Sequence, residues 1–152
     1  DYVYITTPYL VLDNEMITTL TRAAKSGIAV IIIMPHITDK WYAFVVAKTY
    51  YRELIRAGVQ IYEYKPGFVH AKVFVSDDDT ATVGTINLDY RSLYLHFECG
   101  VFIYNNSVVD RVERDFQETL MKCHKVSLVE LRNRSLFSKI AGQVLRLVAP
   151  LM

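Results

Sequence analysis

The chain has 152 residues, of which 52% are hydrophobic, so it can bury one substantial core and is not a disordered chain. Its formal net charge of +1 argues mildly against a nucleic-acid binder that relies on a broad basic face. No run reaches the roughly eighteen apolar residues that a membrane-spanning helix needs.

Strand and helix patterns alternate along the chain. The first helix pattern has Asp13 in an N-cap position and Gly27 just past its end. The β-branched run 28–34 suits a buried central strand, and Pro35 ends it. We expect an α/β fold in which a mixed β-sheet is flanked by helices on both faces. The predicted elements are an opening strand at 1–5, helices over 14–26, 40–57 and 108–122, and strands over 28–34, 59–64, 68–76, 80–85 and 96–104.

The composition changes after Lys125, so we expect a catalytic domain over residues 1–125 and a separate segment over 126–152. That segment is typical of a basic amphipathic helix, which either lies at a lipid interface or docks on a partner domain, and docking is slightly favoured. The chain starts inside a predicted strand, which indicates a fragment of a longer protein. The basic and apolar side chains of the segment are Arg132, Arg134, Lys139 and Arg146 with Leu136, Phe137, Ile140, Val144, Leu147 and Val148.

One short stretch carries most of the functional information, because five residue types fall in it at fixed spacings: His70, Lys72, Asp77, Gly84 and Asn87. Five specified identities recur by accident on the order of one in a million per starting position. The stretch resembles the HxKxxxxD signature of the phospholipase D superfamily, with the downstream Gly-Ser/Thr-x-Asn of that family in register. The resemblance implies phosphodiester transfer through a phosphohistidine.

The residue types fit that chemistry. On a strand, His70 and Lys72 project from one face with Cα atoms roughly 7 Å apart, while Ala71 points into the packed layer. Lys72 and Asn87 are expected to hold the anionic phosphate, and a neutral imidazole at His70 is expected to attack phosphorus. In the superfamily an acidic residue at the offset of Glu98 accepts the proton-bearing nitrogen of the catalytic histidine, which gives Glu98 an orienting role.

We expect structural or substrate-contact roles for the other motif residues. Asp77 is seven residues from His70 and at odd parity along the strand, so we interpret it as structural, together with Gly84. Arg91 and Thr85 are expected to contact substrate, and a structural ion pair is the equal alternative for Arg91.

A metal site is not expected. The two cysteines are far apart in sequence, Cys99 in a predicted strand and Cys123 near a helix end, which is typical of free thiols in a reducing compartment. Neither His36 nor His96 has metal-ligand spacing with them. The resemblance also implies no metal and no other cofactor, because cationic and amide side chains supply the groups that bind the phosphate.

The chain holds one such signature, whereas the superfamily builds its site from two that face each other, one histidine attacking and the other protonating the leaving oxygen. We therefore expect a second HxKxxxxD domain as partner, in the same chain or in a homodimer mate. The isolated monomer should have negligible activity.

The flanking sequence resembles the C-terminal half of bacterial cardiolipin synthases of the phospholipase D type. That resemblance implies phosphatidyl transfer between two phosphatidylglycerols at the membrane of a bacterium, with the catalytic domain in the cytoplasm and the membrane spans in residues outside this chain. No nucleic-acid partner is expected. The alternatives are a phospholipase D-type nuclease or phosphodiesterase working as a homodimer, and a scaffold without chemistry. The segments that carry the resemblance are Thr7-Pro8-Tyr9-Leu10, Tyr50–Leu54, Pro66-Gly67-Phe68, Asn87–Ser92, Phe97-Glu98 and Arg146–Leu151.

Overall fold

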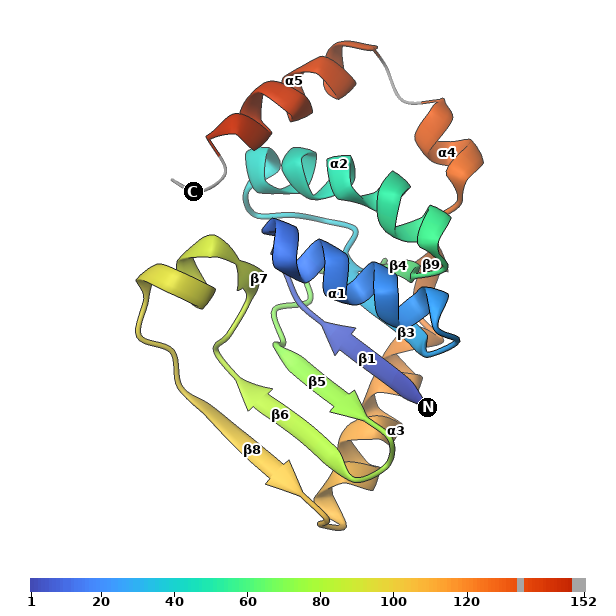
Figure 1. The fold of residues 1–152 in the computed structure, drawn as a ribbon, viewed down its shortest axis with the longest axis vertical. Helices are drawn as coiled ribbons and strands as arrows, with labels where there is room; N and C mark the ends of the chain where they lie inside the picture. Colours follow the sequence, from blue (N-terminus) through green and yellow to red (C-terminus); the bar gives the residue numbers. More distant parts are fainter. Residues whose placement is uncertain (134–135, 149–152) are drawn as a thin grey trace.

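The computed structural model describes residues 1–133 and 136–148, with the side chains of 136–139 outside the description. A seven-stranded mixed sheet forms the centre, in the order β8-β6-β5-β1-β3-β4-β9 (Figure 1). Strands β1, β3 and β4 are parallel, and the remaining neighbours in this sheet are antiparallel. The strands are β1 Tyr2–Thr6, β3 Ala29–Pro35, β4 Gln60–Tyr64, β5 Val73–Ser76, β6 Thr80–Gly84, β8 Gly100–Tyr104 and β9 Cys123–Lys125, and β2 Leu10–Val11 pairs separately with β7 Leu88–Asp89.

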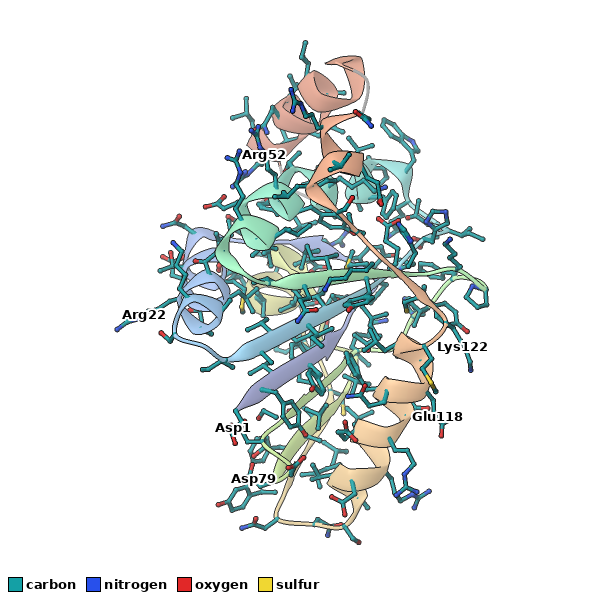
Figure 2. All side chains as sticks on the ribbon, turned by 90° about the vertical axis from the view of Figure 1, so that its right-hand side faces the viewer. Asp1, Arg22, Arg52, Asp79, Glu118 and Lys122 are labelled. Atoms are coloured by element: carbon teal, nitrogen blue, oxygen red, sulfur yellow. The ribbon has the colours of Figure 1, made fainter. Side chains whose placement is uncertain are left out.

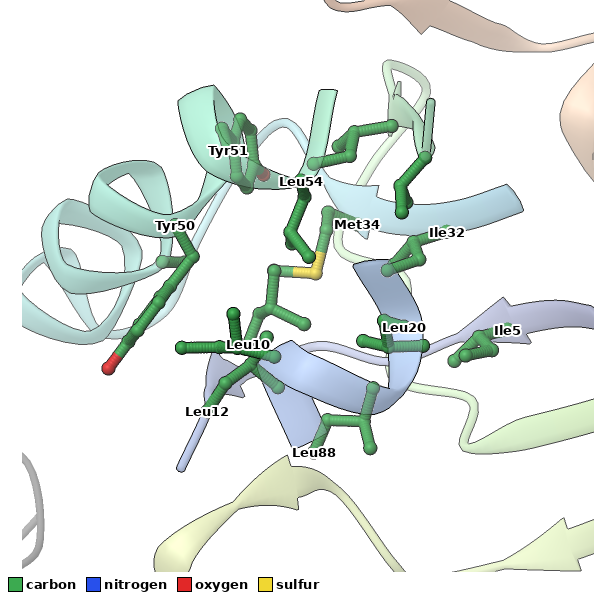
Figure 3. Close-up of a cluster of buried hydrophobic side chains, with 14 of the residues drawn as sticks. Ile5, Leu10, Leu12, Leu20, Ile32, Met34, Tyr50, Tyr51, Leu54 and Leu88 are labelled. Atoms are coloured by element: carbon green, nitrogen blue, oxygen red, sulfur yellow. The ribbon is translucent and has the colours of Figure 1, made fainter. Parts of the chain in front are cut away.

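Helices cover both faces of the sheet, which confirms the predicted fold class. On one face lie α1 (Asn14–Lys25) and α2 (Trp41–Ala57), and on the other lies α3 (Val108–Leu120) (Figure 1). The main core joins the first face to α1 and α2 through large buried side chains that include Ile32, Tyr50 and Leu54 (Figure 3). Phe116 of α3 packs on the opposite face.

Local signals in the sequence account for the helix ends. The Asp13 side chain accepts a hydrogen bond from the backbone N–H of Met16 at 2.7 Å, so the predicted N-cap is confirmed. Gly58 follows α2 with a φ of +106°, a conformation that a glycine adopts without steric cost.

Several predicted strands are shorter in the structure. The strand predicted over 68–76 begins only at Val73, and the strand predicted over 96–104 begins at Gly100. Strand β9, which pairs antiparallel with β4, was not predicted. A single turn of π-helix, η1 (Arg91–Leu95), follows β7. The candidate site lies in the segments just before β5 and β8 and just after β6.

The C-terminal segment packs on α2. Val126 is buried, and its N–H donates to the Ile61 carbonyl oxygen at 2.9 Å, so the first residue of the segment contacts the core. It then forms α4 (Leu128–Arg132) and α5 (Leu136–Leu147). Arg134, the side chains of 136–139 and the final Ala-Pro-Leu lie outside the described residues. No described helix is long and apolar enough to cross a membrane.

Candidate active site

The side chains of His70 and Lys72 meet in the segment that leads into β5. The Lys72 Nζ lies 3.0 Å from the His70 Nε2 and donates to the His70 carbonyl oxygen at 2.7 Å. Lys72 is 7% exposed, whereas His70 is open to solvent. A buried cation against an accessible imidazole suits a nucleophile that must bind an anion.

The two residues do not meet in the way that strand alternation predicts. Both precede β5, and Ala71 between them is exposed rather than packed inward. The long Lys72 side chain folds back onto His70, so the prediction of a shared strand face is wrong, although the two side chains do meet.

Electrostatics favour the neutral form of His70. Burial, followed by the adjacent Lys72 ammonium, lowers the pKa of His70 below its ordinary value of 6.5. Burial also lowers the pKa of Lys72, and the carboxylates of Glu98 and Asp89 oppose that shift. The imidazole is therefore unprotonated at neutral pH, as nucleophilic attack requires.

A chain of hydrogen bonds runs from a carboxamide to a carboxylate beside this pair. The Asn87 Nδ2 donates to the Ser92 Oγ at 3.0 Å, and the Ser92 Oγ donates to the Glu98 Oε1 at 2.7 Å. The Thr85 hydroxyl donates to the other Glu98 oxygen. These donors lower the pKa of Glu98, Thr85 first and Ser92 second. The carboxylate thus fixes Ser92, and Ser92 fixes the Asn87 amide.

The predicted hydrogen bond from His70 to Glu98 is absent among the described residues. Both Glu98 oxygens accept hydroxyl donors instead, because the backbone around Glu98 lies directly against Thr85. Glu98 acts on Lys72 through its charge, which partly offsets the lowering of the pKa of Lys72 by burial. Ser92, which is buried, carries the structural connection and was not among the predicted site residues.

Gly84 makes this arrangement sterically feasible. A Cβ at Gly84 would lie 2.4 Å from the Cys99 carbonyl oxygen and 2.5 Å from the Gly100 Cα. The Thr85 N–H donates to the same Cys99 oxygen at 2.9 Å. A glycine is required for the two segments to approach this closely, which brings Glu98 to Thr85.

Asp77 lies at the other end of β5, in the turn to β6. Its carboxylate accepts a hydrogen bond from the Tyr2 N–H at 2.8 Å and so connects the turn to β1. This position suits the structural role predicted for Asp77 and separates it from His70 by the length of the strand.

Arg91 is engaged by a histidine rather than by a carboxylate. Its Nε donates to the His96 Nε2 at 3.0 Å, and no carboxylate of the described residues forms the predicted ion pair with it. Arg91 also lines a small cavity of about 50 Å³ together with Tyr9, Lys40 and Asp89. A substrate contact by Arg91 stays a prediction, as does one by Thr85, whose hydroxyl is bonded to Glu98.

Aromatic side chains surround the His70 ring, and sequence reasoning did not assign them to the site. The Tyr9 ring lies edge-on to it, with 6.5 Å between the ring centroids. The centroid of the Phe68 ring lies 5.4 Å from that of His70. The Tyr9 hydroxyl donates to the Asp39 Oδ2 at 2.6 Å, and burial raises the pKa of Tyr9. The segments Thr7–Leu10 and Pro66–Phe68 carried the family resemblance, which was the available signal.

The remaining candidates lie apart from this cluster. His36 pairs with the buried Glu63 at 2.8 Å. Within 1–133 and 140–148 no group of three or more His, Cys, Asp or Glu side chains is placed to hold a metal ion. Cys99 is exposed and lies just before β8, so its predicted packing inside a strand is wrong.

Sequence comparison places the chain in a class. A family model described as the cardiolipin synthase, PLD-like domain matches residues 1–120. The chain belongs to this phospholipase D-like family.

Individual relatives within this family are similar to nearly the whole chain. A cardiolipin synthase of Clostridium perfringens is 42% identical over 149 residues, which is 98% of this chain and 31% of that protein. An uncharacterized protein of Streptococcus mutans is 53% identical over the whole chain and 33% of its own length. The chain thus spans about a third of the length of these relatives.

Solved structures share the fold at low sequence identity. The phosphatidylserine synthase of Haemophilus influenzae has a TM-score of 0.76 at 17% identity, covering 99% of this chain and 40% of that one. Nuc, a phospholipase D family member from Salmonella typhimurium, has a TM-score of 0.69 at 18% identity, covering 82% and 81%. These likenesses concern the fold alone.

Proposed function

We propose that the complete protein containing this chain is a cardiolipin synthase that transfers a phosphatidyl group between two phosphatidylglycerols. The observation that carries the proposal is the buried Lys72 side chain held against the accessible imidazole of His70. The relatives named cardiolipin synthase support the choice of substrate, since they match nearly the full chain.

The proposed chemistry has two displacements. His70, or its counterpart in the other half, attacks phosphorus; the N–P bond forms, the bond to the glycerol oxygen breaks, and the second histidine protonates the departing glycerol. The head-group hydroxyl of the second phosphatidylglycerol then gives up its proton to that histidine and attacks phosphorus, and the N–P bond breaks. Lys72 and Asn87 stabilise the anionic oxygens in both steps.

A second HxKxxxxD domain is needed, because one histidine cannot be nucleophile and leaving-group acid at once. The sheet offers a surface for it next to the site. Phe102 and Tyr104 of β8 are 68% and 61% exposed, and Phe97, which adjoins Glu98, is fully exposed. Figure 1 shows no drawn helix over this face of β6 and β8. We propose that the second domain packs here, from the same chain or from a homodimer mate.

We further propose a location at the bacterial membrane, with the spans in parts of the protein outside this chain. Substrate and product of the proposed reaction are both lipids, so the site must work at a bilayer surface.

A phospholipase D-type nuclease or phosphodiesterase is the second candidate. It is favoured by the single HxKxxxxD signature of this chain, which a homodimer would supply twice. The net charge of +1 disfavours this candidate, since binding to the phosphodiester backbone of a nucleic acid relies on accumulated positive charge.

The test uses the complete protein with phosphatidylglycerol and, separately, with DNA. We expect cardiolipin and glycerol in equal amounts, an acid-labile phosphatidyl adduct on a histidine, and no nicked DNA. EDTA should leave the rate unchanged. DNA cleavage without lipid turnover would establish the second candidate instead.

A further inference from the structure

A second cavity lies away from the His70 site, between α2 and the C-terminal helices. It has a volume of about 570 Å³, and none of its lining residues belongs to the candidate active site. Figure 2 shows Arg52, one of these residues, at the end of the molecule that α2, α4 and α5 form, far from Asp79 at the β5–β6 turn. The lining residues are Lys48, Thr49, Arg52, Arg56, Leu128, Leu131, Arg132 and Gln143.

The cavity concentrates positive charge on a nearly neutral chain. Lys48, Arg52 and Arg56 are four residues apart on α2 and therefore share one helix face. Lys48 is compensated by Glu63 at 3.3 Å, and Glu53 lines an adjacent cavity beside the two exposed arginines. Among the described residues, no acidic side chain lines the cavity itself. Two or more guanidinium groups here suit a phosphate group, which guanidinium binds in bidentate fashion.

Helix α5, beside the cavity, turns an apolar face outward. Its inner side packs on α2: a Cβ at Gly142 would lie 2.7 Å from the Thr49 Cγ2, and the Arg146 guanidinium stacks 4.3 Å from the Tyr50 ring centroid. The opposite side exposes apolar residues three and four positions apart, to fractions of 56% for Ile140, 59% for Val144 and 82% for Leu147, and Val148 just after the helix is 43% exposed. An apolar face that is not used for packing is available to a bilayer.

We propose that the α2–α4–α5 cavity and the outer face of α5 form a docking site for anionic phospholipid in a bilayer, separate from the His70 site. The arginines hold the lipid phosphate, and the α5 side chains enter the boundary between head groups and acyl chains. Charge selects the lipid class, because an anionic head group attracts the guanidinium groups with its net charge, whereas the choline cation of phosphatidylcholine offsets the attraction of its phosphate. A soluble phosphate would use the arginines but leave the α5 face exposed.

This site is independent of the proposed reaction. It would hold the chain on membranes rich in anionic lipid, which is also where an enzyme consuming phosphatidylglycerol finds substrate. Docking needs no chemistry at His70, so the two proposals fail separately.

The test measures binding of the 152-residue chain to vesicles of phosphatidylcholine with and without phosphatidylglycerol. The variant Arg52→Gln/Arg56→Gln should bind anionic vesicles about 25-fold more weakly, at about fivefold for each arginine removed. The matched control Arg22→Gln/Arg114→Gln removes two exposed arginines from α1 and α3 and should bind like the wild type. Circular dichroism checks that all variants are folded.

Two further variants test separately whether binding depends on the apolar face of α5 and whether it depends on the His70 site. Leu147→Ser should weaken binding severalfold without a change in folding, because the side chain is 82% exposed. His70→Ala should bind vesicles normally. The proposal is overturned by equal losses in both arginine pairs, by equal binding to vesicles of phosphatidylcholine alone, by unchanged binding of Leu147→Ser, or by loss of binding in His70→Ala.

Discussion

The two ends of the sheet differ in how they are covered. In the parallel part, β3 is packed between helices on both faces, and Ile32 and Ile33 are each 0% exposed. At the other end, β6 and β8 pack on α3, while Phe102 and Tyr104 on the opposite face are largely exposed. The covered end provides the stability of the fold, whereas the open end adjoins the residues of the candidate site. Substitutions at the two ends should therefore affect different measured quantities.

The largest expected effect comes from His70→Ala at the open end. Cardiolipin formation by the complete protein should fall by about 10²- to 10⁴-fold or more, whichever histidine attacks first, since the loss of an acid alone has that effect. The Tm should stay the same because His70 is exposed. The control His124→Ala, a histidine paired with Glu130 away from the site, should retain activity. A parallel drop in Tm would show that His70 supports the fold instead.

The covered end is tested by unfolding in denaturant. Leu54→Ala, at a fully buried position of α2, should lower the free energy of unfolding of the isolated chain by about 2 to 5 kcal/mol. Phe102→Ala at the open end should change it by less than about 0.5 kcal/mol. If the two variants were equally destabilised, the contrast between the two ends would be wrong.

A smaller effect on rate is expected for Ser92→Ala. The substitution removes the hydroxyl between Asn87 and Glu98, so the carboxamide loses its support and kcat should fall about 10²-fold with little change in KM. Thr85→Ser, which keeps the hydroxyl that donates to Glu98, should retain most activity. Full activity of Ser92→Ala would mean that Asn87 needs no positioning.

The smallest effect concerns pH. Because the pKa of His70 is lowered, the acid limb of kcat/KM should have its midpoint below 6.5, and Lys72→Gln should move it to higher pH by removing the neighbouring charge. The same shift determines how the stability of the fold changes with pH. The unfolded chain binds this proton first as the pH falls through 6.5, so stability is lost toward acid pH. A midpoint above 6.5 in a rate profile of the wild type would contradict the shift.

The covered end of the fold was largely predictable from the sequence. An Asp N-cap, glycines after the helices and an uninterrupted β-branched run define α1, α2 and β3 locally. The strand β9 was missed because its three residues, Cys123 to Lys125, carry no alternation, and its pairing with β4 joins distant parts of the chain. The open end was predicted less well: β5 and β8 are short because the residues before them form the site.

The sequence singles out candidate site residues, but the connections between their side chains could not be predicted. Fixed spacing singled out His70, Lys72 and Asn87. The partners of Glu98 depend on the close approach of Gly84 to Cys99, which only the folded backbone reveals. The position of Tyr9 against His70 likewise depends on the pairing of β1 with β5.

The contact between Lys72 and His70 has a consequence for control of the resting enzyme. In the tautomer with the proton on Nδ1, the Lys72 ammonium donates to the His70 Nε2 and occupies the lone pair with which that nitrogen would attack phosphorus. On the proposed chemistry, the imidazole is masked until an arriving phosphate draws the ammonium onto its own oxygens. The negative charge of the substrate then frees the Nε2 lone pair for attack. A neutral ester in the same space does not draw the ammonium away, so the lone pair stays occupied.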